Sequence, residues 1–365
     1  MNASATITHC SVLTPLDIPG GATTWGALCA DQRITEQVAI RDEFLPEDST
    51  LDRSIRLALA AVERLNVNVQ DCQLFCGTSK GPITTFLAAA ENTRRGESLT
   101  ESQATHLALG VGAMGALLRD RLKISAPAHT SVAACSSGLH ALHRAVTAVR
   151  RGECRRALVV AADASLHPLF EGSFTRLGVL APADANGIRR CDPFSEEGNG
   201  FFLIEAAAAL VIENSEFRVQ NSEWPQIEQS WIGADSTGLI AIDEQTRTLR
   251  TALRSFAGEA PAFIHAHATG TAHDQYELAA IQSVFPNTPV FSHKQWLGHS
   301  LGAAALVSVA LSALSHRARR TPTGTAVSAD ARSLTISQGF GGHIGVIALK
   351  SPCASTESRR HASGV

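Results

Sequence analysis

Four short segments of the chain contain the residues that could carry out chemistry. Cys135 lies between small residues in TSVAACSSGLHAL (130–142), where an apolar run gives way to a helical pattern. A helix N-terminus has unsatisfied N–H groups and a partial positive charge, which favour a thiolate over a thiol. Cys135 is therefore a candidate nucleophile, although a buried core cysteine explains this stretch alone equally well.

The other three segments supply histidines, a lysine and glycines. His267, in HAHATGT, follows a strand-like run and precedes small and hydroxylated residues. In SHKQWLGHSLGAAA, we expect Lys294 to end a strand and His299 to open a helix, whose dipole would keep the imidazole neutral. The GFGG run that contains Phe340 could present backbone N–H groups to an oxyanion. Each of these segments alone also fits a purely structural role.

The sequence shows no pattern for a metal or a bound phosphate. His265 and His267 are two apart on an expected strand, but no third ligand follows at a usual spacing. CGTSKG (76–81) is misarranged for a phosphate-binding loop, and the chain has no GxGxxG. We therefore expect no metal and no cofactor.

Length, composition and charge narrow the class of protein. The 365 residues are 44% hydrophobic, which is enough for one large domain or two fused halves. The net charge of −3 gives no reason to expect a nucleic acid or an anionic membrane as partner. No apolar run reaches the ~20 residues of a membrane span, and MNASATITHC lacks the features of a secretory signal. The eight cysteines form no CxxC pair, so we expect reduced thiols and a cytoplasmic location.

Apolar β-branched runs alternate with alanine-rich helical patterns, which is typical of an α/β architecture. The expected strands cover 157–165, 207–213, 262–268 and 288–294, and the expected helices cover 137–153 and 299–314. The stretches around Cys135 and His299 repeat the order strand, polar residue, small-residue helix, which suggests two similar halves. We expect an N-terminal half at 1–213, a C-terminal half at 214–350 beginning in a polar, irregular stretch (214–230), and a disordered tail at 351–365.

Taken together and in order, these segments resemble the elongating β-ketoacyl–acyl carrier protein synthases of the thiolase superfamily. The resemblance runs from about residue 6 to 350 and also includes CSVLTPLD, FTRLGVL and CDPFSEEGNGFFLIEAAAALVIE. It implies a thiolase-like fold whose two halves form the layers α-β-α-β-α. It also implies a decarboxylative condensation of malonyl–carrier protein with a cysteine-bound acyl chain, with no cofactor or metal.

The resemblance assigns a role to each motif residue. Cys135 matches the nucleophile, His267 and His299 match the two histidines that bind the malonyl thioester oxygen, and Lys294 matches the supporting lysine. The remaining matches are Glu277 for the acidic residue of the lysine–histidine network, the N–H groups of Cys135 and Phe340 for the oxyanion hole, and Thr269 and Thr271 for the pantetheine arm.

The family also implies partners, and this chain departs from the family near the expected mouth of the site. The partners are an acyl carrier protein with its phosphopantetheine arm and a second ketosynthase-like subunit, in a homodimer or heterodimer through the strand at 157–165. The chain is unusually short, with compressed segments around the acyl pocket, so we expect a shallow or partner-completed pocket. Asp192 and the pair Glu196–Glu197 would repel an acidic carrier unless it docks elsewhere, for instance near Arg53 and Arg56.

Three functions stay open on the sequence alone. We favour a condensing enzyme of specialised fatty acid or type II polyketide synthesis, because the Cys–His–His set is intact. The second is a non-elongating, chain-length-factor-like partner subunit of a ketosynthase heterodimer. The third is an acyltransferase of the same fold. The sequence leaves the acyl chain length, the pathway and the carrier undetermined.

Overall fold

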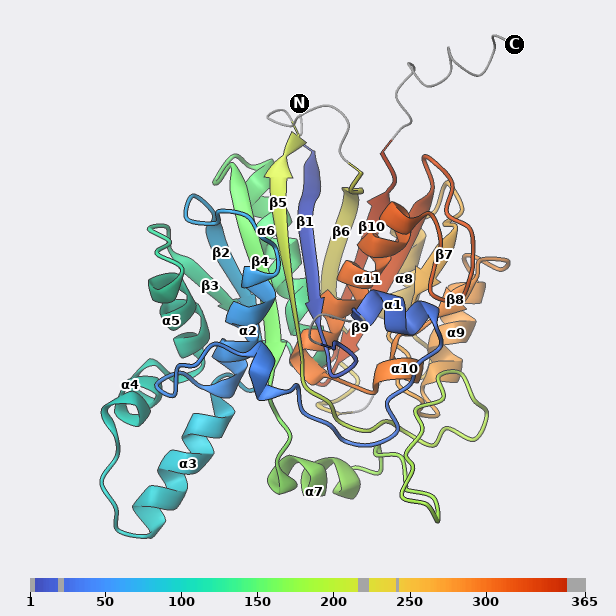
Figure 1. The fold of residues 1–365 in the computed structure, drawn as a ribbon. Coiled ribbons are helices and arrows are strands. Elements are labelled where there is room, and N and C mark those ends of the chain that lie inside the picture. Colours follow the sequence, from blue (N-terminus) through green and yellow to red (C-terminus); the bar gives the residue numbers. More distant parts are fainter. Residues whose placement is uncertain (1–3, 19–22, 216–222, 241–242, 353–365) are drawn as a thin grey trace.

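The structure, a computed structural model, describes residues 4–18, 23–215, 223–240 and 243–352. They form one ten-stranded sheet in the order β3-β2-β4-β5-β1-β6-β10-β9-β7-β8 (Figure 1). The strands are β1 (Ala5–Leu13), β2 (Gln73–Gly77), β3 (Ala128–Ser131), β4 (Arg156–Asp163), β5 (Ala206–Asn214), β6 (Gln226–Ala234), β7 (Phe263–His265), β8 (Val290–Phe291), β9 (Arg332–Gly339) and β10 (His343–Lys350).

The second five strands repeat the arrangement of the first five. In the first half, β2 runs parallel to β3 and β4, whereas β5 is antiparallel to β4 and β1. In the second half, β7 runs parallel to β8 and β9, whereas β10 is antiparallel to β9 and β6. A short antiparallel pairing of β1 with β6 joins the halves. The internal repeat that the sequence suggests is therefore present as a repeated topology.

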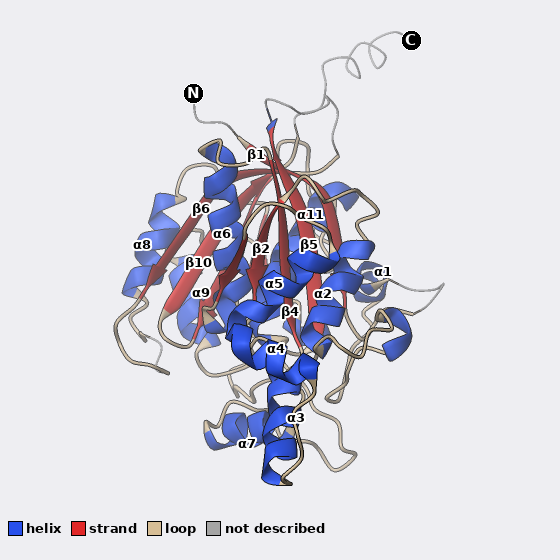
Figure 2. Ribbon diagram, turned by 90° about the vertical axis from the view of Figure 1, so that its left-hand side faces the viewer, coloured by secondary structure: helices blue, strands red, loops and turns tan. Residues whose placement is uncertain are grey.

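Helices form three layers around the two halves of the sheet. One outer core packs α2 and α5 against the first half, and another packs α8 and α9 against the second. Between them, α6 and α11 contact each other and strands of both halves. Figure 2 shows α8 and α2 on opposite sides of the sheet. The helices are α1 (Thr24–Cys29), α2 (Arg53–Glu63), α3 (Ile83–Arg94), α4 (Glu101–Leu109), α5 (Ala113–Arg121), α6 (Ser137–Arg150), α7 (Pro168–Arg176), α8 (Arg247–Ser255), α9 (Asp274–Gln282), α10 (Lys294–Leu297) and α11 (Ala304–Ala318). This is the α-β-α-β-α layering that we expected.

The apolar patterns of the two central helices explain their position. In α6, the stripe of Leu139, Leu142, Val146 and Val149 is fully buried, as its spacing predicts. The stretch Leu301–Ala318 has the length and hydropathy of a membrane span, but 83% of it is buried inside the protein. This stretch is therefore the core helix that its sequence indicates.

Two expectations about the chain differ from the structure. The stretch at 214–230 is not irregular throughout, because β6 begins at Gln226 and continues the sheet. The strand expected at the dimer interface corresponds to β4, which pairs with β2 on one side and β5 on the other. β4 therefore has no open edge, and β3 is the open edge of this half. The position of the boundary between the halves stays a prediction, and residues 353–365 of the tail lie outside the described residues.

Candidate active site

Cys135 lies in a tight turn between β3 and α6. Ala134 has a φ of +47°, and the 3-10 helix Ala134–Ser136 leads into α6. Gly339, at the end of β9, packs against this turn: a Cβ there would lie 2.8 Å from the Ala133 oxygen and 3.1 Å from the Cys135 nitrogen. Only glycine allows this approach, which brings the GFGG turn of the second half to the cysteine.

The electrostatic setting of Cys135 differs from our expectation. Burial raises the pKa of the thiol to about 11, although the positive charges of Lys294 and Lys80 act in the opposite direction. Desolvation outweighs the helix N-terminus because Cys135 is half-buried in the wall of the cavity, where a thiolate would lose most of its hydration. The resting group is therefore a neutral thiol, and a nucleophilic role requires a base beside it.

His299 is placed to be that base. Its Nε2 lies 3.2 Å from the Cys135 sulfur. His299 does not open a helix as expected: it forms a parallel bridge with Leu203, and its backbone N–H donates to the Phe202 carbonyl at 2.8 Å. Burial, and then the charge of Lys294, hold the pKa of His299 well below its usual value. The imidazole is therefore neutral, as expected, but for a different physical reason.

His267 lies in a loop that two carboxylates hold by its backbone. β7 ends at His265, earlier than expected, and the chain turns aside at 266–270. Glu277 accepts the N–H groups of His267 and Ala268, each at 2.8 Å, and Asp274 accepts those of Thr269 and Gly270 at 2.8 Å. Four consecutive N–H groups that leave the sheet are thereby satisfied. The ring of His267 lies edge-on to that of His299, with the centroids 5.8 Å apart.

Lys294 and Glu277 bind different backbone groups of His267, namely its carbonyl oxygen and its N–H. Lys294 does not end a strand but begins the short helix α10, and its Nζ donates to the His267 carbonyl oxygen. The side chain is buried, which lowers the pKa of its ammonium, whereas nearby Cys191, Glu277, Cys135 and Asp274 raise it. Burial and the charge of Asp274 raise the pKa of Glu277 to about 7. Glu277 therefore joins the lysine–histidine network through the backbone of His267.

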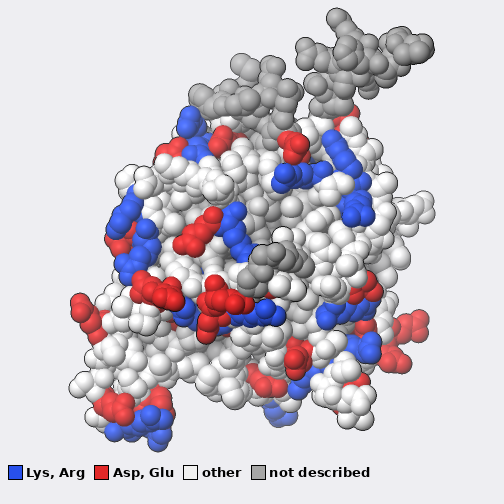
Figure 3. Space-filling view, in the orientation of Figure 1, with Lys and Arg blue, Asp and Glu red and all other residues white. Residues whose placement is uncertain are grey.

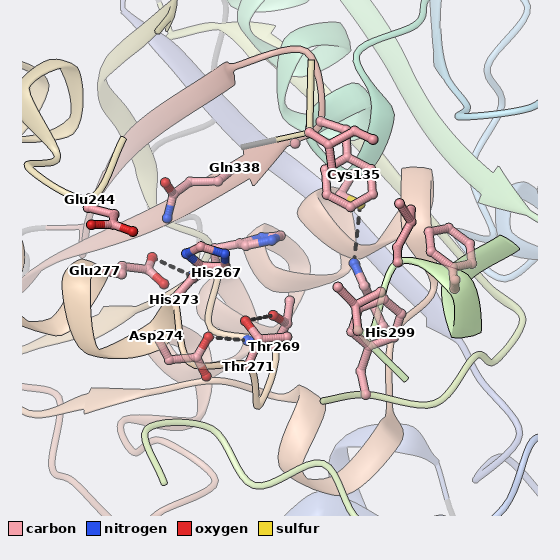
Figure 4. Close-up of a pocket in the computed structure, with 17 residues that line it drawn as sticks. Cys135, Glu244, His267, Thr269, Thr271, His273, Asp274, Glu277, His299 and Gln338 are labelled. Atoms are coloured by element: carbon pink, nitrogen blue, oxygen red, sulfur yellow. Dashed lines mark hydrogen bonds between the residues drawn. The ribbon is translucent and has the colours of Figure 1, made fainter. Parts of the chain in front are cut away.

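These residues surround one cavity of about 280 Å³ (Figure 4). Cys135, His299 and an apolar wall occupy one side, and polar residues occupy the other. Thr269 and Thr271 line the cavity with their hydroxyl oxygens 3.2 Å apart, and Phe340 lines it where its turn meets Cys135. Exposed Ile240 and Glu244 also line it, so it opens to solvent. The apolar wall consists of Phe174, Leu177, Val179, Phe201 and Phe340.

The motif residues to which the resemblance assigns a catalytic, oxyanion or pantetheine role all line this cavity, except Lys294, which lies behind His267. Two further residues were missed. Asp274 is three residues before Glu277 on the first turn of α9, and its position in HDQYE could have indicated this shared face. Gln338 is 6% exposed and lines the cavity beside His267 (Figure 4), but no sequence signal pointed to it. Among the described residues, no three His, Cys, Asp or Glu side chains gather as a metal site.

The face of the molecule drawn in Figure 3 offers no obvious cationic docking site. On the face in Figure 3, Lys and Arg side chains are interspersed with Asp and Glu rather than gathered in one patch. Arg53, which we considered for carrier docking, donates to Glu205 and to Asp42. Its guanidinium is therefore already engaged in ion pairs within the chain.

Comparisons with known proteins identify the class that this fold and site define. Residues 20–217 match the N-terminal domain of β-ketoacyl synthases and residues 232–327 match the C-terminal domain. The chain belongs to the β-ketoacyl synthase family, and it has the thiolase-like fold of that family.

Individual relatives differ widely in length. The highly reducing polyketide synthase ALT1 of Alternaria alternata is 33% identical over 53% of this chain, which spans 8% of that protein. The 3-oxoacyl-[acyl-carrier-protein] synthase I of Hordeum vulgare is 27% identical over 69% of this chain, which spans 57% of that protein. The solved structure of the ishigamide ketosynthase/chain length factor superposes with a TM-score of 0.80 at 21% identity, over 96% of this chain and 100% of that one.

Proposed function

We propose that this chain is a condensing enzyme that joins a malonyl unit on a carrier to an acyl group held on Cys135. The observation that carries the proposal is the 3.2 Å contact between the Cys135 sulfur and Nε2 of a neutral, buried His299, in a cavity that also contains His267. Family membership is consistent with this chemistry, and the geometry supplies a nucleophile, a base and an oxyanion site within reach of one another.

In the first step, an acyl thioester would enter the cavity and the Cys135 sulfur would attack its carbonyl carbon. His299 Nε2 accepts the thiol proton and returns it to the departing thiol of the arm, so no net proton is consumed. The backbone N–H groups of Cys135 and Phe340 would stabilise the negative oxygen of the tetrahedral intermediate. This transfer leaves the acyl group as a thioester on Cys135.

In the second step, the bond between the malonyl carboxylate and its methylene carbon breaks and carbon dioxide leaves. The electron pair passes to the thioester enolate, whose oxygen is stabilised by an N–H of His267, and of His299 when its Nε2 carries a proton. The enolate carbon then attacks the acyl carbon, a carbon–carbon bond forms, and the Cys135 thiolate leaves and takes a proton from water, so that this step consumes one proton overall. No bound cofactor is needed for these electron movements.

Intact-protein mass spectrometry tests this proposal. Incubation with an acyl thioester should add the acyl mass to the wild type, and Cys135→Ala should gain none. The measurement is repeated with an acyl carrier protein and with a second ketosynthase-like subunit, which the open edge of β3 would accommodate. If Cys135 gains no adduct under any of these conditions, the proposal is wrong and the partner-subunit hypothesis is favoured.

A further inference from the structure

A cluster of buried polar side chains lies behind the candidate site. His265 ends β7, His293 immediately precedes α10, Ser308 and Ser312 lie on α11, and Thr335 lies on β9. Their exposed fractions are between 0 and 2%. Polar groups this deeply buried destabilise a fold unless they are hydrogen-bonded, so their bonding pattern is constrained.

The hydrogen bonds assign one tautomer to each histidine. The backbone N–H of His293 donates to His265 Nε2 at 3.2 Å, so His265 carries its proton on Nδ1, which lies 3.2 Å from the Ser312 hydroxyl. The Ser308 hydroxyl donates to the Ala304 carbonyl, so it accepts at 3.2 Å from His293 Nδ1. That same N–H faces His265 Nε2 at 3.0 Å. Both imidazoles are therefore neutral, with donors running from His293 to His265 to Ser312.

This pair connects directly to the two residues whose contact shapes the candidate site. His293 is the N-cap residue of α10 and precedes Lys294 in the chain, while His265 is two residues before His267. The ammonium of Lys294 in turn binds the His267 carbonyl. We propose that His265 and His293 are positioning residues, whose mutual hydrogen bonds set the start of α10 and the end of β7 so that Lys294 holds His267 in place. This inference rests on the proposed function.

A neutral pair suits this position electrostatically. Burial and the adjacent charge of Lys294 hold the pKa of both histidines well below the usual value. A second positive charge beside the buried ammonium of Lys294 would repel it. A proton on His265 Nε2 would point at the two N–H donors of His293, so both hydrogen bonds would be lost. The pair therefore provides rigid hydrogen bonds without adding charge next to the lysine.

The test compares variants at His293 with a matched control, a buried histidine elsewhere in the core. His293→Ala removes the Nδ1 donor, whereas His293→Asn keeps an N–H donor at nearly the same distance from the backbone. His316, on α11, is the control, because it is equally buried but its ring nitrogens bond Ser351 and Ser333, neither of which lines the cavity. His316→Ala should lower the free energy of unfolding by a comparable amount. A loss of activity that occurs only in the His293 variants therefore comes from misplaced site residues and not from reduced stability.

We expect His293→Ala to slow malonyl decarboxylation by about 10- to 100-fold, because small misplacements of a reacting group have effects of this size. Acylation of Cys135 should stay within about threefold, since His299 is held separately by its bridge to Leu203. His293→Asn should recover most of the decarboxylation rate. His265→Ala should match His293→Ala, and the double variant should be no worse than either, as for residues that act as a unit.

A second readout needs no substrate. The pH dependence of Cys135 alkylation by iodoacetamide, followed by peptide mass spectrometry, reports the charges around the thiol, namely Lys294, Lys80, Asp163 and the imidazole of His299. Loosening Lys294 in His293→Ala should shift this profile to higher pH, and His316→Ala should not shift it. A wild type that is never acylated would overturn the proposed function but leave this readout intact. Equal losses in His316→Ala, parallel losses of both steps, or an unshifted alkylation profile would overturn the inference.

Discussion

The two halves of the molecule have the same strand topology but use it differently. In the first half, β3 runs almost directly into the turn with Ala134 at φ +47°, which presents Cys135. In the second half, the corresponding turn has Leu301 at φ +46°, but α10 is inserted between it and β8. The first half therefore presents the candidate nucleophile, Cys135, on its turn, and the second half places Lys294 and His299 ahead of its turn.

The carboxylates behind these turns also differ. In the first half, Asp163 at the end of β4 accepts the Ser79 and Gly302 N–H groups, and so ties the halves together. In the second half, Asp274 and Glu277 bind four N–H groups of a loop within their own half. This difference fits the proposed function, in which the first half holds the sulfur by rigid attachment and the second half shapes a loop to bind the malonyl oxyanion.

The largest expected effect follows from this division. His267→Ala should slow malonyl decarboxylation by roughly 10²–10³-fold, the typical cost of one oxyanion donor. Acylation of Cys135 should continue, because it depends on the first half and on His299. The measurement pairs carbon dioxide release with intact mass. His299→Ala is the comparison variant and should slow both steps; equal loss of both steps in His267→Ala would contradict the division between the halves.

The next prediction concerns Gly339, where the second half packs against the turn that carries Cys135. Gly339→Ala places a Cβ 2.8 Å from the Ala133 oxygen, so the turn carrying Phe340 must move away from Cys135. We expect about 1–3 kcal/mol less free energy of unfolding, as for other overpacked sites, and a slower acylation. Gly172→Ala is the matched control, since a Cβ on Gly172 in α7 meets nothing within 4 Å. Unchanged acylation in Gly339→Ala would show that the oxyanion turn is not needed.

The sequence predicted much of this frame because the relevant signals are local. The runs at β4 and β5 are buried on both faces, and α6 and α11 have the apolar patterns of central helices, so their periodicity identified them. The order of the motifs along the chain resembles that of a known family, and this resemblance predicted that Cys135, His267 and His299 share one site. The early end of β7 was missed because side-chain carboxylates of Glu277 and Asp274 bind the backbone there, and the insertion of α10 was missed because a long-range bond from His299 to the Phe202 carbonyl fixes the segment after it. Neither kind of hydrogen bond is visible in hydrophobic periodicity. The neutral state of Cys135 was missed because it depends on three-dimensional burial.

The raised pKa of Glu277, a residue of the second half, predicts that the free energy of unfolding depends on pH. Its folded pKa of about 7 lies above the ordinary value of 4.5, so the folded state binds more protons between these two values. The free energy of unfolding should therefore fall as pH rises from about 4.5 to 7, through this group. Denaturation at several pH values should show a smaller decline over this range in Glu277→Gln than in the wild type. An identical decline in both would mean that Glu277 titrates normally.

The smallest expected effect concerns Gln338, the polar residue of the cavity that no motif indicated. Its side chain is 6% exposed and lines the cavity, which opens to solvent. Water can therefore satisfy the amide in the ligand-free protein, and Gln338→Leu should change the free energy of unfolding by less than about 1 kcal/mol. If the amide binds a malonyl thioester, the same variant should raise the KM for that substrate several-fold and leave kcat nearly unchanged. Ser315→Ala, at a buried serine on α11 whose hydroxyl bonds the Leu311 carbonyl outside the cavity, is the control for altered polarity. An unchanged KM would show that the amide contacts no substrate, and that the second half contributes only its loop backbone and histidines to binding.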